Sequence, residues 1–131
     1  MKRKKKSNRQ KLVKELDVLW SLLVRKINPR CIMCGTDRNL HAHHCIVRKA
    51  QSNGVRWLLK NGVSLCAGEH LYKLHGQQSD KAWLDRYVRT LDRLIPIEEQ
   101  EEIIEIGHKT TKFSINELQR LRDSFKRRLN V

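Results

Sequence analysis

Cysteine and histidine residues are concentrated in one segment of the chain, and this feature constrains the fold most. Residues 31–75 contain all four cysteines and five of the six histidines. Only 5% of the residues are aromatic, so a chain of 131 residues can build only a modest hydrophobic core. Small folds of this kind are often stabilised by a metal. We therefore expect a fold that is organised around bound metal.

Two residues separate Cys31 from Cys34, a spacing that is typical of a zinc knuckle. One tight turn then directs both thiolates at a tetrahedral ion, and Gly35 relieves the crowding of the backbone after it. Cys66 and His70 follow downstream and strengthen the prediction of a structural zinc site. Disulfides are less favoured, because the first two cysteines are only three positions apart and a reducing compartment is expected.

The formal net charge of +14 indicates a polyanionic partner. DNA is favoured over a membrane, because no apolar run approaches the roughly 20 residues that a membrane span requires. The basic N-terminus is also not followed by the apolar region of a secretory signal. We therefore expect a DNA-binding protein of the cytoplasm, in a bacterial or phage-infected cell. With so few aromatic residues, binding should depend on the phosphate backbone more than on base stacking.

The first 11 residues carry seven basic residues and no acidic one. This composition predicts a disordered basic arm over residues 1–11. Its lysines, among them Lys4, Lys5 and Lys6, are expected to contact DNA phosphates in a salt-dependent way. The alternative is a solvated tail that only adds solubility.

The rest of the chain, residues 12–131, is expected to form a single α+β domain that is mostly helical. A core over residues 28–76 would be followed by a helical extension over residues 79–130. The predicted elements are an amphipathic helix over 10–26, strands over 40–47 and 61–65, a short helix over 69–74, and helices that begin after Ser79-Asp80 and at the capping box of Ser114 and Glu117. Pro96 either ends the helix that follows Asp80 or starts the next one. Two strands and a helix around clustered histidines make a ββα-metal arrangement.

The adjacent residues His43 and His44 are the strongest sign of catalysis. Neighbouring side chains on a strand point to opposite faces, so the two imidazoles cannot easily bind one ion together. They can divide the work, one binding the metal and the other taking a proton from water. Asn61 is suited to orient the base, through its amide or its backbone carbonyl.

The chemically distinctive residues follow one another in a recognisable order: Cys31 and Cys34, His43-His44, Asn61-Gly62, Leu65-Cys66 and His70. In this order, over about residues 15–76, the chain resembles the HNH endonuclease family with an embedded zinc knuckle. The helical tail is more loosely similar to phage recombination nucleases of the NinG type. The resemblance implies that His43 binds a catalytic divalent cation such as Mg²⁺ or Mn²⁺. It also implies that His44 is the general base, that Asn61 positions it, and that the products are a 5′ phosphate and a 3′ hydroxyl.

The chain departs from the family at Glu69, where a second cysteine is usual. Two assignments of the metal ligands then remain open. In the favoured one, His70 completes the zinc site of Cys31, Cys34 and Cys66, and His75 binds the catalytic metal. In the other, His70 stays catalytic, with or without His75. The zinc then takes Cys45, His41 or Glu69 instead, or is absent.

Arg48 and Lys49 follow the histidine pair closely and are candidates for binding a phosphate. Paired cuts by a chain with one active site would require a homodimer. The competing hypothesis is a non-catalytic zinc-knuckle protein that binds DNA through its arm and last helix. The histidine pair and Asn61 favour the enzyme, because a purely structural knuckle needs neither.

Overall fold

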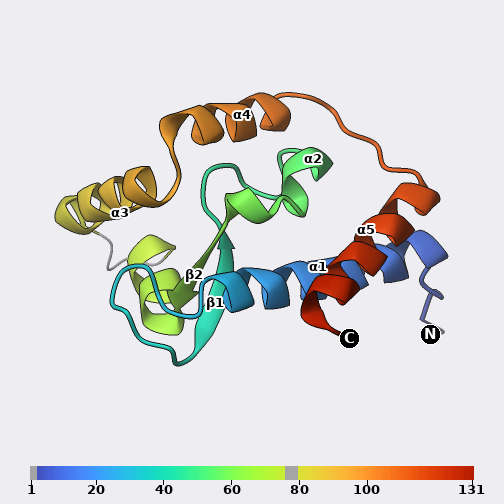
Figure 1. Ribbon diagram of the computed structural model, residues 1–131, viewed down its shortest axis with the longest axis horizontal. Coiled ribbons are helices and arrows are strands. Elements are labelled where there is room, and N and C mark those ends of the chain that lie inside the picture. The colour runs from blue at the N-terminus through green and yellow to red at the C-terminus, as the bar shows by residue number, and fades with distance from the viewer. Residues whose placement is uncertain (1–2, 76–79) are drawn as a thin grey trace.

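The computed structural model describes residues 3–75 and 80–131, except for the side chains of residues 71 and 72. Over these residues the chain is mostly helical with one small antiparallel sheet, as the sequence predicts for an α+β fold (Figure 1). The elements in chain order are α1 (Asn8–Ile27), β1 (Leu40–His44), α2 (Asn53–Arg56), η1 (Leu59–Asn61), β2 (Gly62–Cys66), η2 (Gly68–Leu74), α3 (Lys81–Leu94), α4 (Ile97–Gly107) and α5 (Ile115–Leu129).

Helix α1 begins at Asn8, inside the segment for which the sequence predicts a disordered arm. The Ser7 hydroxyl accepts a hydrogen bond from the Gln10 backbone, and the Gln10 side chain accepts one from the Ser7 backbone. This capping box stabilises the first turn, so the expected arm over residues 1–11 is too long at its C-terminal end. The apolar stripe of α1 is buried, and the part that packs against Leu118 and Phe125 of α5 consists of Leu12, Leu16, Leu19, Trp20, Leu23 and Val24.

Strands β1 and β2 pair antiparallel, with Ala42 opposite Ser64. Side chains alternate between the two faces of the sheet. Ala42 and His44 accordingly face α1, whereas His41 and His43 face η2. The two neighbouring histidines therefore lie on opposite faces, as the sequence predicts.

Helix α3 closes the sheet on the side of η2. Its residues Trp83, Tyr87 and Leu91 pack with Val63 and Leu65 of β2 in a shared core. The Asp80 carboxylate accepts a hydrogen bond from the Trp83 backbone and caps the helix. The other half of the predicted cap, residue 79, and the predicted boundary at residue 76 lie outside the described residues.

The last two helices follow the predicted start signals. Helix α4 begins directly after Pro96, and Ser114 and Glu117 form the expected capping box at the start of α5. Figure 1 shows α3 and α4 along one side of the molecule and α1 with α5 along the other, with the sheet and α2 between them. None of the described helices is long and apolar enough to cross a membrane.

Candidate active site

Three histidines converge where β1 faces η2. Ligand nitrogens of His43, His70 and His75 lie within 4.8 Å of one another. The Nε2 atoms of His70 and His75 are 3.1 Å apart, and the ring centroids of His43 and His70 are 4.9 Å apart. Burial and the neighbouring imidazoles lower the pKa of His43 to about 3 and that of His70 to about 4. These two rings are therefore neutral near pH 7 and can donate lone pairs to a cation.

The helix η2 brings His70 and His75 together. The His75 backbone N–H donates to the carbonyl of His70, 3.2 Å away and five residues earlier, which is π-type hydrogen bonding. In an α-helix, side chains five residues apart would point about 140° away from each other. The wider π turn removes most of this offset, so that both imidazoles reach the same point in space.

A fourth histidine contacts this cluster from the neighbouring position on the same face of β1. The Nδ1 atom of His41 lies 3.0 Å from Nδ1 of His70. Since this contact occupies Nδ1 of His70, it leaves Nε2 of that ring directed at His75. His41 thereby orients a candidate metal ligand from outside the three-histidine cluster.

His44 lies on the other face of β1, against α1. Its ring stacks on the indole of Trp20, with centroids 3.9 Å apart and planes inclined by 10°. Its Nε2 lies 2.8 Å from the carbonyl oxygen of Arg56. Because a carbonyl can only accept, Nε2 carries the proton and Nδ1 is the free basic atom. Burial lowers the pKa of His44, although the Arg56 carbonyl acts in the opposite direction.

The carbonyl that binds His44 belongs to Arg56, and contacts with α1 hold Arg56 in place. The Asp17 carboxylate accepts two hydrogen bonds from the Arg56 guanidinium, at 2.9 and 2.6 Å, and a third from the Trp57 indole at 2.9 Å. Asp17 and Trp20 thus support His44 from one helix, a role that the sequence prediction missed by treating α1 as a packing helix. The available signal was an acidic residue one turn before a buried tryptophan on the same helix.

Asn61 has a different role from the one that the sequence suggests. Its side chain is fully buried; Oδ1 accepts from the backbone N–H groups of Ile46 and Val47, and Nδ2 donates to the carbonyl of Val47. These bonds replace strand pairing and end β1 at His44 rather than at residue 47. Asn61 therefore fixes the loop after the histidine pair, while the carbonyl that orients His44 belongs to Arg56.

The three-histidine cluster and His44 open into one pocket of about 470 Å³. The pocket is lined by His43, His44, Arg48, Lys49, His70 and His75. It contains the predicted general base, the candidate metal ligands and the predicted phosphate contacts. Of the three arm lysines, Lys6 lines a separate pocket next to α1, while Lys4 and Lys5 are exposed.

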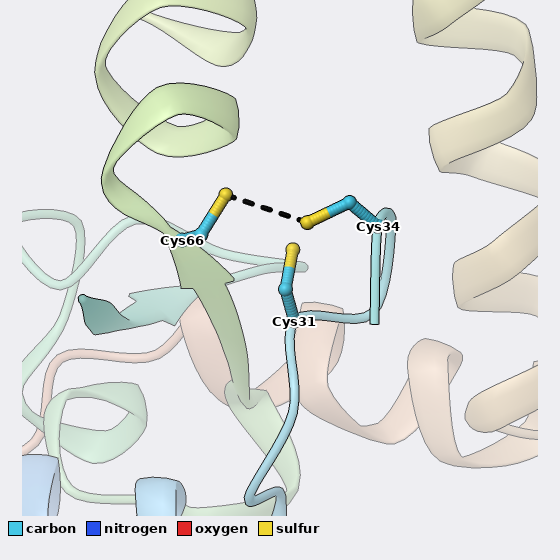
Figure 2. A group of neighbouring side chains, drawn as sticks. All are labelled: Cys31, Cys34 and Cys66. Atoms are coloured by element: carbon cyan, nitrogen blue, oxygen red, sulfur yellow. Dashed lines mark hydrogen bonds between the residues drawn. The ribbon is translucent and has the colours of Figure 1, made fainter. Parts of the chain in front are cut away.

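The three sulfur atoms of Cys31, Cys34 and Cys66 also lie within 4.8 Å of one another, and those of Cys34 and Cys66 are 3.6 Å apart. Figure 2 shows the three thiols pointing toward one another from the loop after α1 and from the end of β2. Burial raises the pKa of Cys31, but backbone hydrogen bonds from Cys34 and Cys66 outweigh this effect and lower it. Such bonds favour the thiolate, the form that binds a metal.

The favoured assignment of His70 to this cysteine cluster is wrong, because His70 lies with His43 and His75. The other candidates for a fourth ligand are engaged elsewhere. Glu69 accepts a hydrogen bond from the Trp83 indole at 2.6 Å, and His41 contacts His70. Cys45 packs in the hydrophobic core, where burial raises its pKa to about 12.

Among the described residues, the cysteine cluster thus offers three ligands. Three thiolates fit the soft, tetrahedral preference of zinc and leave one position for a further donor. Compared with protein-family models, with curated proteins and with solved structures, the chain matches none of them.

Proposed function

We propose that this protein is a divalent-metal-dependent DNA endonuclease of the HNH type. One observation carries the proposal: a single pocket combines a three-histidine cluster, a separate histidine with a free basic nitrogen, and two cationic side chains. Hydrolysis of a phosphodiester needs these three functions together, namely a cation, a base for water and a group that holds the phosphate.

His44 is the proposed general base. Its Nε2–H is fixed by the Arg56 carbonyl, and no described residue occupies Nδ1. Nδ1 would take a proton from a water molecule, whose oxygen forms a bond to phosphorus as the bond to the 3′ oxygen breaks. A base that is neutral at pH 7 suits this step, and burial keeps His44 neutral.

His43, His70 and His75 are the proposed ligands of the catalytic metal. A divalent cation bound there would neutralise charge on the scissile phosphate and stabilise the leaving oxygen. Among the described residues, no carboxylate joins the three imidazoles. Imidazole ligands suit Zn²⁺, Co²⁺ or Ni²⁺ better than Mg²⁺ or Mn²⁺, which prefer oxygen ligands. These transition metals are therefore favoured over the two ions first expected from the sequence.

The resemblance to HNH endonucleases is consistent with two local features of the chain. The ending at Leu74 and His75 resembles that of the family once one inserted residue is allowed, and the π turn of η2 accommodates an extra residue. Three cysteines lie together as a partial zinc knuckle, which we propose to be a structural zinc site. By the same resemblance, the enzyme would act in the recombination or processing of phage DNA.

Cleavage of supercoiled plasmid tests the proposal. Wild-type protein should nick the plasmid with Mn²⁺, Co²⁺, Ni²⁺ or Zn²⁺, and His44→Ala should lower the rate by about 100-fold or more, the usual contribution of a general base. His108→Ala is the matched control, since His108 is exposed at the end of α4. If wild-type protein shifts DNA on a gel but cuts nothing with any metal, the enzyme is excluded and a non-catalytic DNA-binding protein is the better description.

A further inference from the structure

A second pocket, of about 410 Å³, lies next to the histidine pocket along the first half of α1. Asp17 lines both pockets, so the two meet at this residue. The second pocket is lined by four cationic side chains, which are Lys6, Arg9, Lys14 and Arg56.

Two of these four cations are already engaged. Arg56 binds the Asp17 carboxylate, and Arg9 donates a hydrogen bond to the carbonyl of Phe113 at 2.8 Å. Lys6 and Lys14 are exposed, and no carboxylate of the described residues lies within ion-pairing distance of either. The excess charge of the pocket therefore belongs to Arg9 and to these two lysines, and of the three only Arg9 is held by a backbone carbonyl.

Lys6 and Lys14 also lie close enough to affect each other. Both residues line the same pocket, and the neighbouring Lys14 side chain lowers the pKa of the Lys6 ammonium. Two ammonium groups held together repel each other, and an anion between them removes the repulsion. On the basic helix α5, by contrast, Lys126 and Arg122 are paired with Glu15 at 3.0 and 3.9 Å.

We propose that Lys6 and Lys14 form a phosphate-binding pair that holds the DNA backbone on one side of the cut. DNA leaving the histidine pocket would pass Asp17 and follow α1 toward its N-terminus. Asp17 lies nine positions after Asn8 on the helix, about 14 Å along its axis, which corresponds to about four base pairs of duplex. This inference rests on the proposed function for the position of the cut, but binding by the two lysines can be measured without cleavage.

The test compares DNA binding by Lys6→Gln/Lys14→Gln with that of Lys81→Gln/Lys109→Gln, which removes the same charge from exposed positions outside both pockets. All proteins carry His44→Ala, so that DNA stays intact and the metal ligands are retained. Fluorescence anisotropy with a short duplex is measured between about 50 and 200 mM salt.

Loss of two phosphate contacts should weaken binding roughly tenfold at the higher salt and reduce the slope of log K against log salt by about 2, whereas the control should keep the slope. Circular dichroism should show an unchanged fold for both. An unchanged slope in Lys6→Gln/Lys14→Gln, or an equal loss of slope in the control, would contradict the proposed phosphate-binding pair.

Plasmid cleavage by the wild-type protein, which retains His44, distinguishes a failure of this proposal from a failure of the proposed nuclease function. A reduced slope in the double variant supports the lysine pair even if the wild-type protein cuts nothing. Cleavage by the wild-type protein together with an unchanged slope in the double variant would support the nuclease function and contradict the phosphate-binding pair.

Discussion

The imidazole of His44 lies flat on the indole of Trp20, with ring centroids 3.9 Å apart and planes inclined by 10°. The indole N–H in turn donates to the carbonyl of Leu58 at 3.1 Å, which fixes the plane on which the imidazole rests. Together with the Arg56 carbonyl, this contact leaves His44 little freedom to rotate. The position of the proposed base therefore depends on a helical residue that precedes it by more than 20 positions.

Trp20→Phe and Trp20→Leu should separate stacking from packing. Both substitutions remove the indole N–H, but only phenylalanine keeps an aromatic face for His44. We expect Trp20→Leu to be less stable than Trp20→Phe by about 1 kcal/mol, the usual contribution of an aromatic pair beyond its buried area. Urea unfolding measures the difference, and plasmid nicking should rank the variants in the same order. Equal stability and equal nicking of the two variants would show that aromatic stacking on residue 20 does not position His44.

Asp17→Asn should weaken the support of Arg56. We expect a loss of about 1–2 kcal/mol at pH 7, because charge-assisted bonds to Arg56 and Trp57 are replaced by weaker ones at a partly exposed site. Asp123→Asn is the matched control; its ion pair with Arg122 lies on α5 and should contribute less than about 0.5 kcal/mol.

The effect of Asp17 should also depend on pH. Burial alone would raise the pKa of Asp17, but its bonds to Arg56 and Trp57 outweigh this effect, so the pKa is lowered in the folded state. A lowered pKa stabilises the fold above the ordinary carboxyl pKa of about 4, and this contribution is lost as the pH falls through the folded value. The stability difference between wild type and Asp17→Asn should therefore be constant near neutral pH and shrink below about pH 4. A difference that grows on acidification would contradict this assignment.

Asn61→Ala should lower the stability of the fold, and any loss of cleavage should be a consequence of this lower stability. Removal of the amide leaves the buried N–H groups of Ile46 and Val47 and the carbonyl of Val47 without their partner. At about 1–3 kcal/mol for each unsatisfied group, the variant should lose about 3 kcal/mol or more. The measurement is the free energy of unfolding from urea titration. A variant that unfolds like the wild type but no longer cleaves would support the role in positioning His44 that the sequence suggests.

Most element positions could be predicted from local signals in the sequence. The stripe of α1, the proline before α4 and the capping box of α5 each act within a few residues. The start of α1 was harder, because the charge of residues 1–11 favours disorder while Ser7 and Gln10 form a cap in the same segment. The local cap prevailed over composition from Asn8 onward.

Two parts of the site could be predicted from the sequence. The spacing of the cysteines predicts the cluster of Cys31, Cys34 and Cys66, and strand alternation predicts that the two adjacent histidines face opposite ways. His43 and His44 separate because neighbouring side chains on a strand face opposite ways. The partner of His70 could not be read from spacing, since a position four residues after Cys66 suits either cluster. The π-type turn of η2 and the contact with His41 decide it, and both depend on packing. The bond of Asp17 to Arg56 spans 39 residues, so the local pattern of Asp17 and Trp20 on α1 could mark Asp17 but could not identify its partner.

The two clusters should bind metal independently. Cys31→Ala should lose the zinc of the cysteine cluster and lower the melting temperature, because a structural site contributes its binding energy to folding. His43→Ala should keep the fold and lose only the metal of the histidine cluster. Elemental analysis of purified protein should give two metal ions per chain for the wild type and one for each variant that folds. A single metal in the wild type that is lost from both variants would contradict two separate sites.

Glu69→Cys should complete the cysteine cluster. Residue 69 follows Cys66 by three positions, the same spacing that separates Cys31 from Cys34, and it opens η2 beside the cluster. In the wild type its carboxylate binds the Trp83 indole instead. A fourth thiolate should tighten zinc binding by about tenfold or more in competition with a chelator, since structural zinc sites are four-coordinate. Glu69→Gln is the matched control, because it retains an acceptor for Trp83 and adds no thiol. Unchanged zinc affinity in Glu69→Cys would mean that the fourth position is already filled by another donor.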